Sequence, residues 1–312
     1  MFRRNRNGHA GWTAVSWLAE GIAVARVQRS ANTRPRIDLC RLYDGADSAA
    51  ALEKAARDAE LRSGTCSSVL NSGAYQMLLV DAPNVQPDEL KTAIRWVVKD
   101  LIDYHIDDAT VDVLDLPPDP NGATRTHQMY AVTARNSVIQ NIVDMFADAK
   151  VALDVIDIPE MAQRNLASLV EEPGRGLALL SFDEAGGLLT ISYGGELYLT
   201  RRIDISALQL SQASDVARTH LFDRITLELQ RSLDHFDRQY HFISVTKLYL
   251  APLIEGVALR EHLAESVYVN VLDYKLAEVF DISMAPQLNQ MDEQRRYWLT
   301  LGAALREETR VL

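Results

Sequence analysis

One segment of the sequence combines residue types that can bind phosphate and magnesium. Residues 183–190 (DEAGGLLT) join two stretches with the composition of β-strands. Gly186 and Gly187 let backbone N–H groups approach an anion closely, the hydroxyl of Thr190 can bind a phosphate oxygen, and Asp183 can hold a hydrated magnesium ion. The same residues also suit a tight β-turn. The segment is therefore either a phosphate-binding turn or a purely structural one.

The signatures of other enzyme classes are absent from the sequence. It contains no GxSxG, GxxxxGK[ST] or GxGxxG motif, so a nucleophile elbow, a Walker loop and a Rossmann loop are not indicated. The seven histidines lack the i, i+4 spacing that places two imidazoles on one helical face. Cys40 and Cys66 form no CxxC pair. We therefore expect no metal site, and the cysteine usage is typical of a reducing cytoplasm.

Composition and charge restrict the partners. A length of 312 residues predicts about two domains, and 47% hydrophobic with 24% charged residues is ordinary for a globular protein. The 43 acidic and 32 basic residues give a net charge of −11, which predicts no broad nucleic-acid surface. No run of 18 uninterrupted apolar residues occurs, so the sequence predicts no membrane-spanning helix.

The elements around the DEAGGLLT segment follow a linker-like break at residues 171–176 (EEPGRG). Gly194-Gly195 predicts a hairpin, because a type I′ turn needs positive φ at both central residues. Residues 215–240 carry apolar positions at three- and four-residue steps and predict a long helix. The remaining strands of this half are expected at residues 177–182, 188–193, 196–201, 247–250 and 267–272.

The middle of the chain predicts a compact α+β unit over residues 75–156, in the order β-α-β-β-α-β. Pro87, with Asp88 and Glu89 in the first turn, starts a helix that we expect to run to about Asp103. Its apolar positions predict one buried stripe made of Leu90, Ile94, Val97, Val98, Leu101 and Ile102. Such a unit leaves an edge or groove that can accept an extended peptide.

Five short segments in order resemble the PilM type of pilus-assembly protein, a branch of the actin-like ATPases. They are ELKTAIRW at 89–96 followed by YHIDD at 104–108, AVTAR at 131–135, VIDIPEMA at 155–162, LELQRSLD at 227–234 and LTLGAALR at 299–306. The order of the DEAGGLLT hairpin, a strand ending in RRIDI and a long Glu-x-x-Arg helix is similar to the second lobe of those ATPases. The resemblance covers most of the chain from residue 75 onward.

The resemblance implies an α/β, actin-like (ribonuclease H-like) bilobed fold with an inserted α+β subdomain. Residues 1–74 would form the first lobe, completed by 157–175 and by a C-terminal helix over 292–312. Residues 75–156 would be the inserted subdomain and 176–291 the second lobe. Only residues 205–215 separate the hairpin from the long helix, so a reduced fourth subdomain is expected.

The resemblance also implies a nucleotide site that has lost part of its contacts. The matching positions that remain are Asp183, Gly186, Gly187, Thr190, Glu228 and Arg231. Ser16 and Leu18 stand where the family has the Asp-x-Gly of its first phosphate loop. Residues 250–253 (LAPL) replace its Gly-Gly adenosine loop, and proline has no N–H to offer. We therefore expect no catalysis and no cofactor, with ATP and magnesium as the alternative.

By resemblance, the chain is a non-catalytic cytoplasmic adaptor of a type IV pilus assembly platform, of the mannose-sensitive haemagglutinin kind, peripheral at the inner membrane. Its expected partners are a PilN-like bitopic inner-membrane protein, bound through its short cytoplasmic tail, and other platform proteins. The matching positions for the tail are Arg95, Trp96 and Tyr104, unless these residues only pack or face solvent. The alternatives are an actin-like ATPase, kinase or nucleotide-regulated switch that uses Asp183 and Thr190, and a cell-division type filament protein.

Overall fold

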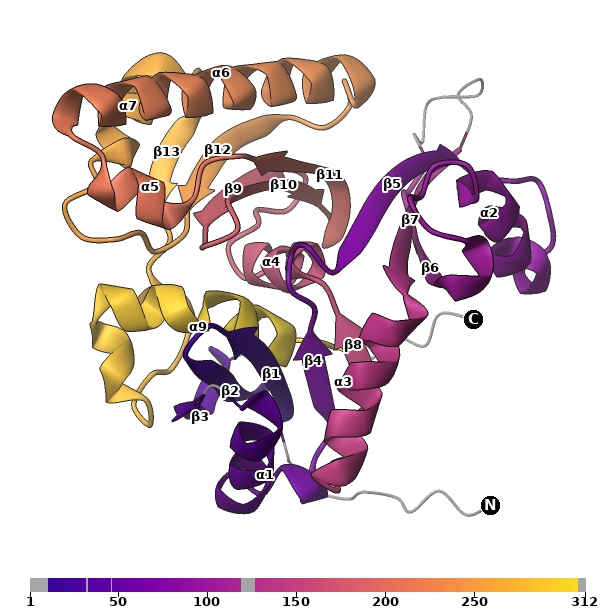
Figure 1. Ribbon diagram of the computed structural model, residues 1–312. Coiled ribbons are helices and arrows are strands. Elements are labelled where there is room, and N and C mark those ends of the chain that lie inside the picture. Colours follow the sequence, from indigo (N-terminus) through magenta and orange to yellow (C-terminus); the bar gives the residue numbers. More distant parts are fainter. Residues whose placement is uncertain (1–10, 32, 46, 119–126, 308–312) are drawn as a thin grey trace.

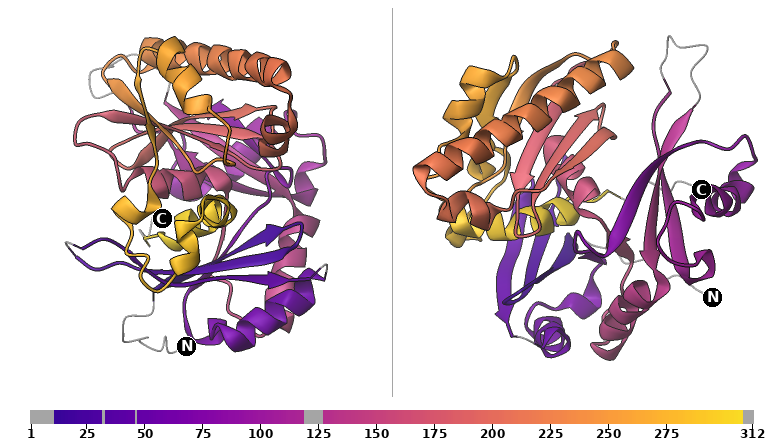
Figure 2. Two further views of the ribbon diagram at one scale, coloured as in Figure 1. Left: turned by 90° about the vertical axis from the view of Figure 1, so that its left-hand side faces the viewer. Right: turned by 45° about the horizontal axis from the view of Figure 1, so that its top comes forward.

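The computed structural model describes residues 11–31, 33–45, 47–118 and 127–307, and three β-sheets organise this part of the chain (Figure 1). The strand orders are β3-β2-β1-β4-β8, β11-β10-β9-β12-β13 and β5-β7-β6. The first two sheets form two lobes that lie one above the other, and the third stands beside them (Figure 2). Of the helices in the described ranges, none combines the length and apolar character that crossing a membrane requires.

The first lobe is a five-stranded sheet covered on both faces. Its strands are β1 (Trp12–Leu18), β2 (Gly21–Gln28), β3 (Arg36–Asp44), β4 (Cys66–Val69) and β8 (Val155–Asp157). Helices α1 (Ser48–Asp58) and α3 (Asn136–Asp148) share a core with one face. Helices α4 (Pro159–Ala167) and α9 (Met291–Ala304) share a core with the other, together with the short α8 (Leu276–Val279) and the 3₁₀ turn η4 (Pro286–Asn289).

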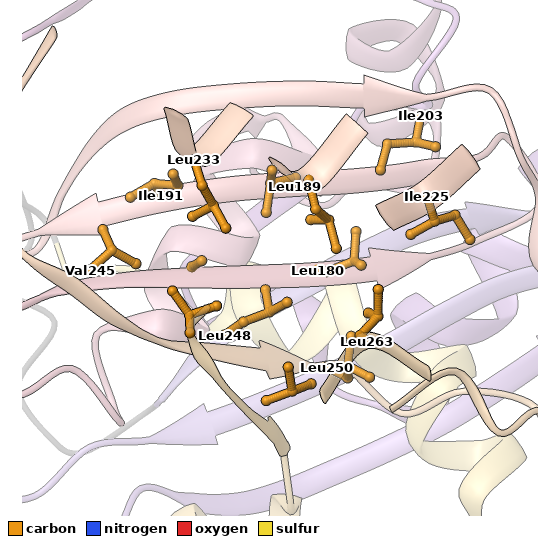
Figure 3. Packing of buried hydrophobic residues seen from close by; sticks show 14 of the residues in the cluster. Leu180, Leu189, Ile191, Ile203, Ile225, Leu233, Val245, Leu248, Leu250 and Leu263 are labelled. Atoms are coloured by element: carbon orange, nitrogen blue, oxygen red, sulfur yellow. The ribbon is translucent and has the colours of Figure 1, made fainter. Parts of the chain in front are cut away.

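The second lobe repeats this plan with β9 (Gly176–Phe182), β10 (Gly187–Tyr193), β11 (Glu196–Ile203), β12 (Val245–Leu250) and β13 (Asn270–Asp273). Helices α6 (Asp215–Gln239) and α7 (Leu259–Ser266) cover the outer face, where Leu189, Ile225 and Leu248 are completely buried (Figure 3). Only α5 (Ala207–Gln212) lies between β11 and α6. The Gly194-Gly195 turn has φ of 61° and 78°, as the sequence predicts.

The predicted 75–156 unit contains a three-stranded sheet that has a core of its own. Strands β5 (Tyr75–Asp81), β6 (Ala109–Asp115) and β7 (Gln128–Arg135), with α2 (Leu90–Val98) and the 3₁₀ turns η2 (Pro87–Glu89) and η3 (Ile106–Asp108), enclose their own core. Helix α3 buries Ile142 and Phe146 in a core that includes both Val15 of β1 and Ala134 of β7, and β8 pairs with β4 of the first sheet. Helix α3 therefore packs against the first lobe and against the inserted sheet. The predicted helix to Asp103 ends at Val98, and turns follow.

An ion pair with a buried carboxylate joins the inserted subdomain to both lobes. Arg202 of β11 lies 2.8 Å from Glu160 at the start of α4, and the Glu160 side chain is only 3% exposed. Arg202 Nη2 also donates to the Tyr75 hydroxyl (2.7 Å), and that hydroxyl donates to Glu160. Burial raises the pKa of Tyr75, so this hydroxyl stays a proton donor. The three residues tie β5, α4 and β11 together.

Helices α4 and α9 cross at a distance that only glycine permits. Asn165 Nδ2 donates to the carbonyl of Gly302 (3.0 Å), and a Cβ at Gly302 would lie 2.2 Å from the carbonyl oxygen of Ala162. Around this crossing, one core includes residues of both lobes, among them Ala25 of β2 and Leu179 of β9. The crossing therefore holds the lobes together.

We predict that Gly302→Ala destabilises the protein by about 3 kcal/mol, because backbone atoms of α4 cannot move aside at low cost. Urea denaturation of the full chain measures the free energy of unfolding. Gly64→Ala is the matched control, since nothing lies within 4 Å of the methyl group that alanine would add there. An effect of Gly302→Ala no larger than that of the control would contradict this account of the crossing.

Candidate functional site

A cavity of about 450 Å³ lies between the two lobes, a volume within the range of small-molecule sites. It brings together segments that are far apart in the sequence: the β1–β2 turn at residues 16–20, the loop at 69–73 after β4, the turn at 183–185 and Ala251-Pro252. Helix α9 contributes Arg295, Arg296, Trp298 and Thr300. Of the six residues that the resemblance assigns to a nucleotide, Asp183 alone lines this cavity.

The Asp183 carboxylate is used within its own turn. Its Oδ1 accepts hydrogen bonds from the backbone N–H groups of Ala185 (2.8 Å) and Gly186 (3.0 Å). Close packing explains why both positions of the predicted phosphate loop are glycine. Gly186 has φ of +142° and lies against the Ile203 carbonyl, and a Cβ at Gly187 would lie 2.7 Å from the Phe182 ring. These contacts favour a structural turn over a phosphate-binding turn at residues 183–190.

Thr190 lies away from the cavity, in a buried polar network beneath α4. Its Oγ1 accepts a hydrogen bond from Gln163 Nε2 (3.0 Å), and both residues are almost fully buried. Gln163 also donates to the carbonyls of Leu179 and Leu188, and it accepts from the hydroxyl of Ser181. This hydroxyl stabilises the contact between α4 and the second sheet.

Glu228 and Arg231 lie on α6, over the outer face of the second lobe, and neither lines the cavity. Glu228 accepts from Arg201 Nη2 (3.2 Å), and its other oxygen lies 3.5 Å from Arg231 Nη1. The i, i+3 spacing does place the two side chains together. Helix α6 packs on the outer face of the second lobe, so both side chains lie away from the cavity.

Helix α9 makes direct contacts with the β1–β2 hairpin, where the resemblance places the first phosphate loop. Ser16 Oγ accepts from Thr300 Oγ1 (2.9 Å), and both residues are buried. Glu20 forms an ion pair with Arg296 (3.3 Å) at the cavity wall. Within the described residues, no three His, Cys, Asp or Glu side chains are grouped as metal ligands. These residues do not fit a magnesium–nucleotide complex as the resemblance describes it.

Two of the three predicted tail-binding residues make internal contacts. The Arg95 guanidinium donates to the carbonyls of Ala109 (2.8 Å) and Ile106 (2.7 Å), which fixes the 3₁₀ turn after α2. The Tyr104 hydroxyl donates to Thr133 Oγ1 (3.1 Å). The Arg135 guanidinium lies 4.3 Å from the centre of the Tyr104 ring. Both side chains therefore support the inserted subdomain.

Trp96, the third residue, is 68% exposed, and Val97 (40%) and Leu101 (55%) are exposed beside it. We call these three residues the α2 surface. The sequence places Val97 and Leu101 in the buried stripe, which is wrong. A three-stranded sheet is narrow, and only Ile94 and Val98 of α2 are buried against it. The Ala-x-x-Trp-Val spacing was the available signal for an outward apolar face.

The two lobes, the cleft between them and the inserted sheet have the arrangement of an actin-like fold, which confirms the predicted fold class. No protein-family model and no curated protein matches the sequence. Among solved structures, the chain is similar to one described as the PilM-PilN type IV pilus biogenesis complex. The TM-score is 0.70 at 20% identity, covering 96% of this chain and 98% of the other.

Two further solved structures are similar over much of their length. One is a Bacteroides thetaiotaomicron protein of actin-like ATPase fold and unknown function, with a TM-score of 0.49, 10% identity and coverage of 90% and 96%. The other is the cytoplasmic domain of EpsL, an inner-membrane component of the type II secretion system of Vibrio cholerae. Its TM-score is 0.46 at 13% identity, with coverage of 82% and 94%.

We predict that Arg95→Ala lowers the free energy of unfolding by about 2 kcal/mol, because two charge-assisted hydrogen bonds to backbone carbonyls are lost. Chemical denaturation of the full chain measures the change. Arg231→Ala is the control, since its side chain is 65% exposed and its ion pair is long, and we expect less than about 0.5 kcal/mol. Equal effects of the two variants would mean that Arg95 does not hold the turn.

Proposed function

We propose that the chain is a cytoplasmic adaptor of a type IV pilus assembly platform. In this role a PilN-like single-pass protein holds it at the inner membrane, and the cytoplasmic tail of that protein docks on the inserted subdomain. The observation that carries the proposal is the similarity of the whole chain, inserted subdomain included, to a structure from a PilM-PilN complex. The five ordered sequence segments support the same assignment.

Within this proposal we favour the mannose-sensitive haemagglutinin kind of pilus and further contacts with other platform proteins. The short connection between β11 and α6, which holds only α5, supports a reduced variant of the fold. The changed cleft contacts support an adaptor without catalysis, because the Asp183 carboxylate is engaged in its turn and Ser16 offers no carboxylate.

The second candidate function is a nucleotide-regulated switch. The cavity between the lobes has the size of a small-molecule site, and two arginines, Arg295 and Arg296, contribute to its wall. An anionic ligand bound by these arginines would contact both α9 and the turn at Asp183.

We expect Mg-ATP to leave the melting temperature unchanged and to be hydrolysed no faster than by an Asp183→Ala variant, because the residues that would hold metal and phosphate are separated. A ligand present at 100 times its Kd would add about 2.7 kcal/mol to the stability of the folded state. Differential scanning fluorimetry across a Mg-ATP titration, with an ATPase assay on the same preparation, makes the measurement. A saturable rise in melting temperature would favour the switch.

We also expect the full chain to enter the membrane fraction only when a single-pass partner of the same pilus system is produced with it. The matched control is the same partner without its cytoplasmic tail, which should leave the chain in the supernatant. Membrane fractionation followed by immunoblotting reads the result. Binding to membranes that contain the tail-less partner, or no partner, would contradict the proposed function.

A further inference from the structure

One arginine in the wall of the cavity between the lobes has no acidic partner. Arg295, in the second turn of α9, is half-buried and contributes to this wall. It forms no ion pair and no hydrogen bond with the residues that the structure describes, and its Nε is buried. A cation that is partly removed from water without gaining a partner is unfavourable. The position of Arg295 therefore indicates an anion in the cavity.

The next turn of the same helix carries a second unpaired donor. Trp298 follows Arg295 by three residues, which places the two side chains on one face of α9. Trp298 also lines the cavity and is only 4% exposed, and its indole Nε1 has no hydrogen-bond partner within the described chain. The indole of Trp17, by contrast, donates to Ser68 Oγ (2.9 Å). Buried donors without acceptors are rare in folded proteins, so two neighbouring ones in one wall point to a ligand.

Most other charged groups of the cavity wall are engaged within the chain. Arg296 pairs with Glu20 (3.3 Å). Asp183 accepts two backbone hydrogen bonds inside its own turn. Glu184 is exposed and forms no ion pair with a described residue. Among the described residues of this wall, Arg295 is therefore the cation that is left to pair with a ligand.

This balance of charges selects the charge of the ligand. The wall contains two arginines and three carboxylates, which sum to −1. A phosphate monoester carries about −1.5 to −2 at pH 7, and a nucleotide with several phosphates carries more. In the described ranges no three acidic, histidine or cysteine side chains are grouped to hold a compensating metal ion. A single negative charge, in contrast, is neutralised by Arg295 alone.

Apolar side chains contribute much of the remaining wall. They come from both lobes and include Trp17, Leu18, Leu70, Phe182 and Leu299. The volume of about 450 Å³ is that of a small-molecule site. Pockets of this kind bind an apolar body and use a few polar groups to orient it. The wall therefore fits a molecule with one anionic end and an apolar body.

We propose that the cavity between the lobes binds a small organic carboxylate without a metal ion, and that Arg295 holds the carboxylate. This inference rests on the second candidate function, a ligand-regulated switch, and replaces the nucleotide by a monoanion. A carboxylate fits because its two oxygens match the planar fork of a guanidinium, which forms two parallel hydrogen bonds with them. The bound molecule contacts α9 of the first lobe and Phe182 of the second, so its binding stabilises the contact between the lobes.

The test uses the full chain and matched probes. Hexanoate, cyclohexylacetate and phenylacetate are monocarboxylates with apolar bodies of different shape, and the corresponding amides have the same bodies without the charge. Isothermal titration calorimetry in a buffer with EDTA measures binding. We expect at least one carboxylate to bind at least tenfold more tightly than its amide and to raise the melting temperature. No binding of any of the three carboxylates, or equal affinities of each acid and its amide, would overturn the proposal.

Variants of Arg295 identify the binding group. Arg295→Gln removes the charge and should weaken binding of the carboxylate at least tenfold, because charge-assisted hydrogen bonds are lost. Arg295→Lys keeps the charge but not the fork and should bind with intermediate affinity. Arg231→Gln is the matched control, since this arginine is 65% exposed on α6 and lies outside the cavity wall. Circular dichroism monitors the fold, and equal affinities of Arg295→Gln and the control would refute the role of Arg295.

Two further measurements distinguish this inference from the functions proposed above. ATP, added with magnesium or with EDTA, should not displace the carboxylate, and nucleotide binding that Arg295→Gln abolishes would replace the carboxylate by a nucleotide. Recruitment to membranes by the single-pass partner should be unchanged in Arg295→Gln. Failure of all carboxylates to bind, with recruitment intact, would refute this site and leave the adaptor function standing. Carboxylate binding by a chain that no partner recruits would do the reverse.

Discussion

The close crossing of α4 and α9 is the contact on which the arrangement of the two lobes depends. Gly302 brings the backbone of α9 against Ala162, and the surrounding core includes strands of both sheets. Side chains from the same two helices also make polar contacts with both sheets. Gln163 of α4 is bonded to β9 and β10, and Thr300 of α9 to β1. Pro159 at the start of α4 and several residues of α9 line the cavity between the lobes.

Residues of α9 also make direct contacts within the cleft between the lobes. Ser16 and Glu20, on the hairpin that would hold phosphate, are bound by Thr300 and Arg296 of α9. On the opposite wall, Asp183 closes its own turn. Hydrogen bonds and ion pairs within the chain therefore engage several polar groups of the cleft, whereas Arg295 Nε has no hydrogen-bond partner among the described residues.

The inserted subdomain relates to the lobes in a different way. A buried ion pair, Arg202 with Glu160, and the Tyr75 hydroxyl fix the base of its sheet. Farther from this joint, the Tyr130 hydroxyl contacts the Tyr198 carbonyl, but α2 has no neighbour outside its own sheet among its main contacts. Displacement of Arg202 would leave the buried Glu160 carboxylate without its charged partner, which is unfavourable because that carboxylate is only 3% exposed. The subdomain is thus joined to the second lobe along strands β5 and β7, at Tyr75, Tyr130 and Gln128.

The sequence by itself determined the local elements and the fold class. Gly194-Gly195 predicts its hairpin because the turn requires positive φ, and the periodicity of residues 215–240 predicts α6 because one face must be apolar. The order of five short segments was sufficient for the actin-like fold.

What the sequence did not determine was the side of each element that faces a neighbour. Strand β10 is buried on both faces, so the alternation cannot tell whether Thr190 lies toward the cleft or beneath α4. The stripe of α2 is wider than the three-stranded sheet can cover, which leaves Val97 and Leu101 exposed. Glu228 and Arg231 are neighbours by helical spacing, but the face that α6 covers is set by packing between elements distant in sequence. Local propensity acts over a few residues, whereas the choice of a face depends on which distant surface is available to bury it.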